Sequence, residues 1–122
     1  MIKTHGLSHI SLSVRDPDRA LAFYQKLFGV REYHRDDHSI QALGPGPHDV
    51  IAFDRRPSHG RPGGIDHFGF RLTDPSDIHE AVRQSKAAGA KVLRQGEFGP
   101  GLPFAYIQDP DGYTIELWFE PD

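Results

Sequence analysis

Polar and apolar residues alternate in two short segments of the chain. Residues 8–14 and 66–72 both carry an apolar side chain at every second position, which predicts a half-buried β-strand in each. His9 lies on the polar face of the first segment. His67 lies at the matching point of the second, with Arg71 further along the same face. The two segments therefore read as copies of one strand.

An Asp-Pro pair follows each of these segments and predicts the start of a helix. Asp16-Pro17 and Asp74-Pro75 each provide an N-cap side chain followed by a proline at the first helical position, where the missing N–H costs no hydrogen bond. Apolar residues then recur at helical spacing up to Gly29 and Gly89, and glycine is favoured just past a helix C-terminus.

Three further strands are expected after each helix, separated by turns rich in Gly, Pro and Asp. They lie near residues 30–34, 38–43 and 49–54 in the first copy and near 91–95, 103–108 and 113–119 in the second. A pattern repeated at a fixed offset indicates a duplicated structural unit. The fold class is therefore α+β, with two βαβββ modules at residues 1–57 and 65–122 and a flexible linker at 58–64.

Composition excludes several classes of function. The net charge is -3 and no run of Lys or Arg exceeds two residues, so the basic footprint of a nucleic-acid-binding protein is missing. We expect no membrane span and no signal peptide, since no apolar stretch approaches the required length. The absence of Cys excludes disulfides and thiolate metal sites and fits a cytoplasmic protein.

Three residues with metal-binding side chains lie on strand faces turned away from the helices. They are His9, His67 and Glu116. If the two modules pair their sheets, these faces form one concave surface. Two imidazoles and a carboxylate suit Fe²⁺, Mn²⁺, Ni²⁺ or Zn²⁺, and three protein ligands leave positions open for a substrate. The alternative is that both histidines are hydrogen-bonded strand residues and that Glu116 is a solvated surface carboxylate.

Segments of both copies resemble the vicinal-oxygen-chelate superfamily, which contains glyoxalase I, bleomycin-resistance proteins, fosfomycin-resistance transferases and extradiol dioxygenases. The similar segments are Leu7-Ser-His-Ile-Ser-Leu-Ser-Val14, Asp16-Pro-Asp-Arg-Ala-Leu-Ala-Phe-Tyr24, Leu27-Phe-Gly29, Ile65-Asp-His-Phe-Gly-Phe70 and Tyr106-Ile-Gln-Asp-Pro-Asp-Gly-Tyr-Thr-Ile-Glu116. The resemblance implies paired modules that form a cup-shaped mixed sheet, usually in a homodimer. It also implies that His9, His67 and Glu116 occupy metal-ligand positions.

The shared chemistry of this superfamily is chelation of a small substrate by a divalent metal through neighbouring oxygens. The metal acts as a Lewis acid in a lyase, isomerase or dioxygenase reaction. The resemblance implies that Tyr106 hydrogen-bonds to or protonates the bound intermediate, beside Glu116. Phe104 and Trp118 share the face of Tyr106 and are expected to line an apolar pocket. Arg71 is expected to bind an anionic group of the substrate or to form a salt bridge at the rim.

The chain departs from each branch of the superfamily at one point. Glyoxalase I uses a fourth ligand near the end of the first module, but the matching strand here reads Asp49-Val-Ile-Ala-Phe53, with apolar residues where that carboxylate would lie. This disfavours isomerisation of a glutathione hemithioacetal. Fosfomycin-resistance transferases hold a phosphonate with basic residues, whereas residues 120–122 are acidic. Extradiol dioxygenases use additional histidines around the metal site, and no His follows His79.

Two alternatives stay open at the level of sequence. A metal-free binding protein that sequesters an aromatic molecule in a dimer cleft is the rival to an enzyme, and it should tolerate the change His67→Ala. The metal site is built either within one chain or across a dimer, with His9 meeting His67 and Glu116 of the other subunit.

Overall fold

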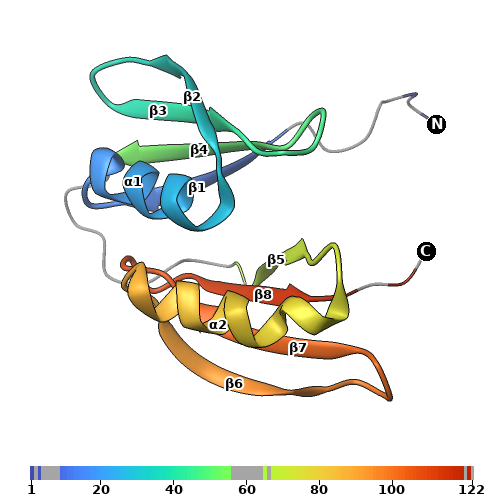
Figure 1. Cartoon of the computed structure of the whole chain (residues 1–122). Coiled ribbons are helices and arrows are strands. Elements are labelled where there is room, and N and C mark those ends of the chain that lie inside the picture. The colour runs from blue at the N-terminus through green and yellow to red at the C-terminus, as the bar shows by residue number, and fades with distance from the viewer. Residues whose placement is uncertain (2, 4–8, 56–64, 66, 120, 122) are drawn as a thin grey trace. The chain divides into compact units, whose positions relative to one another are not determined.

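The chain folds into two compact units, Met1–Gly60 and Arg61–Asp122, each built from one sheet and one α-helix (Figure 1). The computed structural model describes residues 1, 3, 9–55, 65, 67–119 and 121. The predicted linker at 58–64 lies outside the described residues. Among the described residues, no helix is both long enough and apolar enough to cross a membrane.

The first unit has the predicted strand–helix–three-strand order. Its elements are β1 (Ile10–Val14), α1 (Pro17–Phe28), β2 (Arg31–Arg35), β3 (Ser39–Leu43) and β4 (Val50–Arg55). The sheet order is β1-β4-β3-β2. β1 runs parallel to β4 and the other neighbours are antiparallel, so the sheet is mixed.

The second unit repeats this order. Its elements are β5 (Phe68–Arg71), the 3₁₀ turn η1 (Pro75–Asp77), α2 (Ile78–Ala87), β6 (Lys91–Glu97), β7 (Pro103–Gln108) and β8 (Thr114–Trp118). The sheet order is β5-β8-β7-β6, again with one parallel pair. The predicted α+β class and duplicated βαβββ order are thus confirmed, whereas pairing of the two sheets into one cup stays a prediction.

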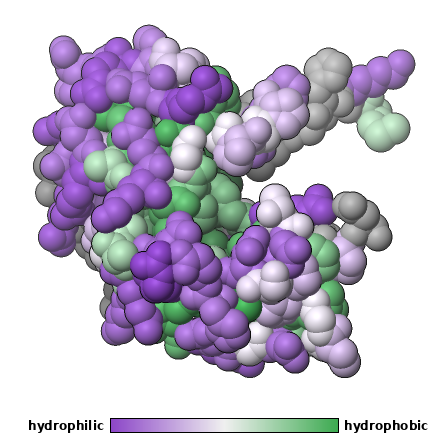
Figure 2. All heavy atoms as spheres, viewed as in Figure 1, coloured by the Kyte–Doolittle hydropathy of each residue, from purple (hydrophilic) through white to green (hydrophobic). Residues whose placement is uncertain are grey.

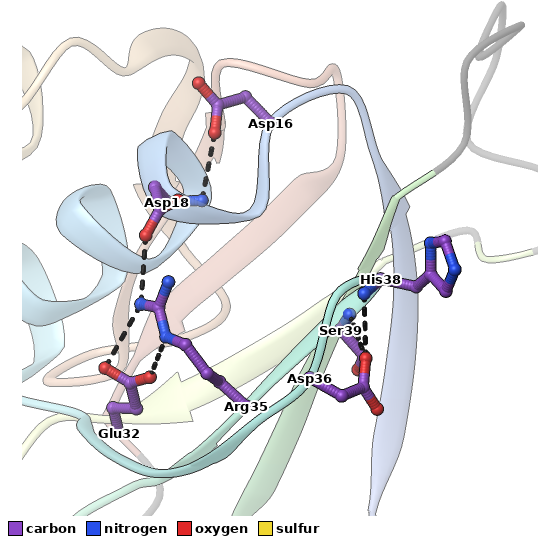
Figure 3. Close-up of polar contacts among 7 residues, drawn as sticks. All are labelled: Asp16, Asp18, Glu32, Arg35, Asp36, His38 and Ser39. Atoms are coloured by element: carbon purple, nitrogen blue, oxygen red, sulfur yellow. Dashed lines mark hydrogen bonds and ion pairs between the residues drawn. The ribbon is translucent and has the colours of Figure 1, made fainter.

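Polar side chains define the start of α1 and the turn between β2 and β3 (Figure 3). The Asp16 carboxylate accepts hydrogen bonds from the backbone N–H groups of Asp18 and Arg19 at 3.0 and 3.2 Å, as an N-cap should. Arg35 on β2 contacts Asp18 at 2.9 Å, which ties the edge strand to the first turn of α1. In the β2–β3 turn, the backbone N–H groups of His38 and Ser39 donate to Asp36 and hold the pKa of that carboxyl below its usual value.

The second helix begins differently from the prediction. The Asp74 carboxylate accepts from the backbone N–H and the hydroxyl of Ser76, but the residues it caps form the 3₁₀ turn Pro75–Asp77. The backbone N–H of Asp77 donates to the carbonyl of Asp74 at 3.2 Å, and α2 begins only at Ile78. The prediction that the α-helix starts at Pro75 was therefore wrong by three residues, because this first turn is wound more tightly.

The two units fill their cores with different side chains. In the first unit the ring of Tyr24 on α1 packs 5.1 Å from that of Phe53 on β4, and both side chains are fully buried. In the second unit Ile107, Ile115 and Leu117 occupy the buried face, at most 2% exposed. Hydrophilic side chains cover the β2–β3 hairpin at the top of the first unit (Figure 2).

Candidate functional site

The second unit carries most of the predicted site residues on one face of its sheet. Successive residues of a strand point to opposite faces, and α2 packs on β7 and β8. The face toward α2 is built from Ala105, Ile107, Ile115 and Leu117. The opposite face, called here the open face, carries Phe104, Tyr106, Glu116 and Trp118.

Strand register arranges the open face in two rows that cross the sheet from β5 to β6. The Glu116 row consists of Gly69, Glu116, Tyr106 and Arg94. The Trp118 row consists of Arg71, Trp118, Phe104 and Gly96. The first row holds groups that can bind metal or move protons, and the second places two aromatic side chains, Trp118 and Phe104, next to each other.

Glu116 is the centre of the polar contacts in its row. The hydroxyl of Tyr106 donates to Glu116 Oε1 at 3.2 Å. On the other side, His67 Nε2 lies 3.3 Å from Glu116 Oε2. The Glu116 side chain is only 14% exposed, whereas His67 is 37% exposed. Each carboxylate oxygen therefore has its own partner, and the side chain is held in one orientation.

His67 is positioned by its place just before β5 and by its contact with Tyr106. The His67 ring packs edge-on against the Tyr106 ring, with centroids 5.4 Å apart and an interplanar angle of 81°. Gly69, two residues later, lies directly opposite Glu116. A Cβ at Gly69 would lie 2.9 Å from the Glu116 carbonyl oxygen, so only glycine allows β5 to approach this closely.

The Trp118 row includes an aromatic contact that the sequence analysis missed. Phe98, in the turn after β6, stacks on Phe104 with ring centroids 4.1 Å apart and meets Trp118 edge-on at 5.8 Å. The guanidinium of Arg94 lies 5.4 Å from the centre of the same Phe104 ring. The available signal for Phe98 was an apolar residue beside Gly99 in a turn, where apolar residues are uncommon.

The sequence comparison assigns the chain to a known family. Residues 6–117 match the Glyoxalase/Bleomycin resistance protein/Dioxygenase superfamily. The chain belongs to this superfamily. The match spans both units and includes every predicted site residue except Trp118, which directly follows the matched range.

The relatives most relevant to the site are named for different enzyme activities. A putative lactoylglutathione lyase from Brassica oleracea var. gemmifera is 35% identical over 124 residues, covering 89% of this chain and 42% of that protein. A manganese-dependent 2,3-dihydroxybiphenyl 1,2-dioxygenase from Geobacillus genomosp. 3 is 26% identical over 117 residues, covering 92% of this chain and 36% of that protein. The chain thus spans less than half the length of these two relatives.

A solved structure shows the same fold over nearly the whole chain. The fosfomycin resistance protein FosX from Listeria monocytogenes, complexed with Mn(II) and sulfate, superposes with a TM-score of 0.82 at 24% identity. The alignment covers 98% of this chain and 93% of FosX. Superfamily membership therefore establishes the architecture. The choice of substrate depends on the side chains of the site, because one fold can host many functions.

The first unit supplies only one of the three predicted metal ligands. His9 is exposed and directly precedes β1, as His67 directly precedes β5. At the position equivalent to Glu116, the first unit has Ala52, which lies opposite Ser11 in the parallel pair. Within either unit, the described residues contain no cluster of three His, Asp or Glu side chains suited to a metal ion.

Arg71 lies at the β5 end of the Trp118 row. It is opposite Trp118 in the register, and its side chain is exposed. The structure therefore brings together Tyr106, Glu116 and His67 in one group, and Phe104 and Trp118 in the adjacent one, with Arg71 at the edge.

Proposed function

We propose that this protein is a divalent-metal-dependent enzyme whose small substrate binds the metal through neighbouring oxygen atoms. Its metal ligands are His67 and Glu116 of the second unit and His9 of the first. The observation that carries the proposal is the pair formed by His67 Nε2 and Glu116 Oε2, 3.3 Å apart.

The donor atoms fit a divalent metal in type and spacing. Two neighbouring ligands of one ion, each bonded at about 2.1 Å, are separated by roughly 3 Å. A carboxylate that is only 14% exposed is costly to desolvate without a cationic partner, and a metal ion provides one. Imidazole nitrogen with carboxylate oxygen suits Fe²⁺, Mn²⁺, Ni²⁺ and Zn²⁺. When bound, such an ion supplies Lewis-acid stabilisation of negative charge on a substrate oxygen.

Tyr106 has two roles in this proposal. Its hydroxyl donates to Glu116 Oε1, which leaves Oε2 directed at His67 and available as a ligand atom. The hydroxyl has a single proton, so when a substrate oxygen lies beside Glu116 the hydroxyl turns from Oε1 and donates to that oxygen instead. We infer that Tyr106 hydrogen-bonds to or protonates this oxygen, while Arg71 binds an anionic group of the substrate.

The relatives support two reaction classes. Lactoylglutathione lyase and manganese-dependent dioxygenase are both names carried by proteins similar to this chain over about nine-tenths of its length. Ala52 at the position equivalent to Glu116 argues against a fourth carboxylate ligand at that point of the first unit. A three-ligand site leaves more positions for substrate, which suits a dioxygenase as well as a lyase or isomerase.

The aromatic Trp118 row favours a second candidate, a metal-free protein that binds an aromatic molecule. Phe98, Phe104 and Trp118 offer stacking surfaces that require no metal. In either function we expect a homodimer, in which His9 completes the site of its own chain or that of its partner.

The deciding experiment is elemental analysis of protein purified without chelators, measured both as purified and after incubation with Mn²⁺. We expect about one Fe, Mn, Ni or Zn ion per chain, lost in His67→Ala. His79→Ala is the matched control, because His79 is an exposed histidine on α2 of the same unit. Wild-type protein that neither carries nor takes up a divalent ion would contradict the enzyme and favour the binding protein. The metal found in the protein as purified then directs the substrate screen, with catechols for iron and manganese and hemithioacetals for nickel and zinc.

A further inference from the structure

Three aromatic residues of the second unit form a cluster that the proposed reaction does not use. In this cluster Phe98 stacks on Phe104 at an interplanar angle of 17° and meets Trp118 edge-on at 82°. Phe104 is only 3% exposed, whereas Phe98 is 53% exposed. The cluster therefore has a buried base and an exposed ring above it, an arrangement that leaves aromatic surface accessible to a ligand.

The cluster lies beside the proposed metal ligands. Phe104 precedes Tyr106 by two residues on β7, and Trp118 follows Glu116 by two residues on β8. Because β7 and β8 are antiparallel, both steps lead in the same direction, from the Glu116 row to the Trp118 row. Two residues of a strand span about 7 Å. A six-membered ring attached to a chelating group beside Glu116 therefore reaches the aromatic cluster.

Gly96 makes the stacked arrangement possible. It lies opposite Phe104 in the β6–β7 register, where a Cβ atom would come within 3.0 and 3.1 Å of two Phe104 ring atoms. The Phe104 ring thus occupies the space of the missing side chain, and Phe98, two residues further along, covers it. Arg94 contacts the same ring from the Glu116 row and adds a cation–π interaction.

We propose that this cluster is the subsite for a planar aromatic ring on the substrate, and that Phe98 is the residue that selects for it. The inference rests on the proposed function for the position of the chelating oxygens. Stacked and edge-on contacts both occur in the cluster, and such contacts attract a further aromatic ring beyond what burial of apolar area provides. An aliphatic substituent gains only the burial.

The test compares two ligands with the same chelating group. Benzohydroxamate and acetohydroxamate both bind metals through two neighbouring oxygens and differ in carrying a phenyl or a methyl group. Calorimetric titration of the Mn²⁺-loaded protein gives both affinities. We expect benzohydroxamate to bind at least about tenfold more tightly, because the phenyl ring both buries more apolar area than the methyl group and makes aromatic contacts with the cluster. Trp118 is the only tryptophan of the chain, so its fluorescence should respond to benzohydroxamate and locate the ring.

Two variants with matched controls assign the preference to the cluster. Phe98→Ala should reduce the preference for benzohydroxamate by roughly three- to tenfold while leaving acetohydroxamate affinity unchanged. Leu93→Ala is its control, since Leu93 is another exposed apolar residue of the same hairpin, 44% exposed. Gly96→Ala should also lower the preference, because it displaces the Phe104 ring. Its control is Gly99→Ala, whose new Cβ would make only an ordinary 3.6 Å contact with Leu102.

The results of these titrations distinguish failure of the aromatic subsite from failure of the proposed metal site. Equal affinity for both ligands, or equal behaviour of Phe98→Ala and Leu93→Ala, overturns the aromatic subsite even when the metal is bound. If the wild-type protein takes up no metal, the proposed enzyme fails, and the same titration without metal decides the subsite. Binding of benzohydroxamate that is weakened by Phe98→Ala then supports the aromatic subsite, and absence of binding overturns it.

Discussion

The two units share a topology but place different side chains at equivalent positions of the open face. In the second unit, the β7–β8 register sets Tyr106 opposite Glu116. In the first, the β3–β4 register sets Gln41 opposite Ala52 at the same point. An amide and a methyl group thus stand where the second unit has a phenol and a carboxylate. The strand order and register required for folding are therefore present in both units, whereas the carboxylate of Glu116 and its hydrogen-bond donor Tyr106 have no counterparts at these positions of the first.

The shared features extend to an irregularity of the edge strands. The register shifts between Glu32 and His34 in the first unit and between Val92 and Arg94 in the second. A bulge at the same place in both units bends the edge strand and increases its twist. Such a bulge belongs to the scaffold, because it is equally present in the unit whose open face lacks the acid.

The first unit has its own polar contact on the open face. Ser11 donates a hydrogen bond to the Asp54 carboxylate, two positions along β4 from Ala52. Asp54 is the equivalent of Trp118, since Ser13 lies opposite Asp54 as Arg71 lies opposite Trp118. Both units therefore carry a carboxylate on this face, but among the residues that the structure describes only Glu116 has a histidine nitrogen at 3.3 Å.

The largest expected effect is on the free energy of unfolding, and it comes from substitutions in the two cores, which differ in aromatic content. Phe53→Ala removes a fully buried ring that packs against Tyr24, and we expect it to destabilise the first unit by about 3–5 kcal/mol. Leu117→Ala removes the equivalent aliphatic side chain of the second unit and should cost about 2–5 kcal/mol.

Urea unfolding followed by circular dichroism measures both changes. Two transitions, each shifted by only one of the variants, would show that the units unfold separately. A single transition shifted by both variants would show that the difference in core composition does not divide the chain. A loss below about 1 kcal/mol for Phe53→Ala would contradict its place in the core, since large-to-small core changes cost more.

The next largest expected effect is on metal affinity, and it concerns Glu116 on the open face of the second unit and Asp54 on the equivalent face of the first. Glu116→Gln keeps the shape of the side chain but removes the proposed ligand charge, and we expect Mn²⁺ affinity to fall by more than about 100-fold. Asp54→Asn is the matched variant in the first unit and should leave the affinity unchanged. Competition with a metal-binding indicator dye measures both. An equal loss in the two variants would show that metal binding is not confined to the ligands proposed here.

The sequence predicted the scaffold well because its signals are local and repeated. The segment 103–108 was expected as a strand, and β7 runs from Pro103 to Gln108. Alternation also placed Glu116 on the face of Tyr106, since side-chain direction in a strand follows from position alone. Antiparallel register then accounts for the contact between them, ten residues apart along the chain.

Other parts of the site depend on tertiary contacts that the local pattern does not contain. Phe98 lies outside the predicted strands, and only its ring contacts with Phe104 and Trp118 give it a place in the site. The contribution of Arg94 depends on the bulge in β6, which the alternation does not reveal. The role of His9 depends on how modules or subunits pack, so it stays a prediction.

The smallest expected effect is on stability, and it concerns the two Asp-Pro segments at which the helices begin. These segments are alike in sequence but differ in structure. Asp16 caps an α-helix directly, whereas Asp74 caps the 3₁₀ turn and also accepts from the Ser76 hydroxyl. The hydrogen bonds from the Ser76 hydroxyl and backbone N–H hold the pKa of Asp74 below its ordinary value of 3.8. Since the folded state favours the carboxylate, its contribution to stability is present above that value and is lost as the pH falls through the lowered pKa.

We therefore expect Asp74→Asn to unfold at a slightly lower urea concentration than the wild type at pH 6, with the difference shrinking as the pH falls below about 4. Urea midpoints measured for both proteins at pH 6 and pH 3 test this, with Asp77→Asn as the control for loss of a nearby charge. Asp77 lies in the same 3₁₀ turn and forms no side-chain cap of the helix that follows it. A difference that is the same at both pH values, or equal in the two variants, would mean that the second helix start does not depend on the charge of Asp74.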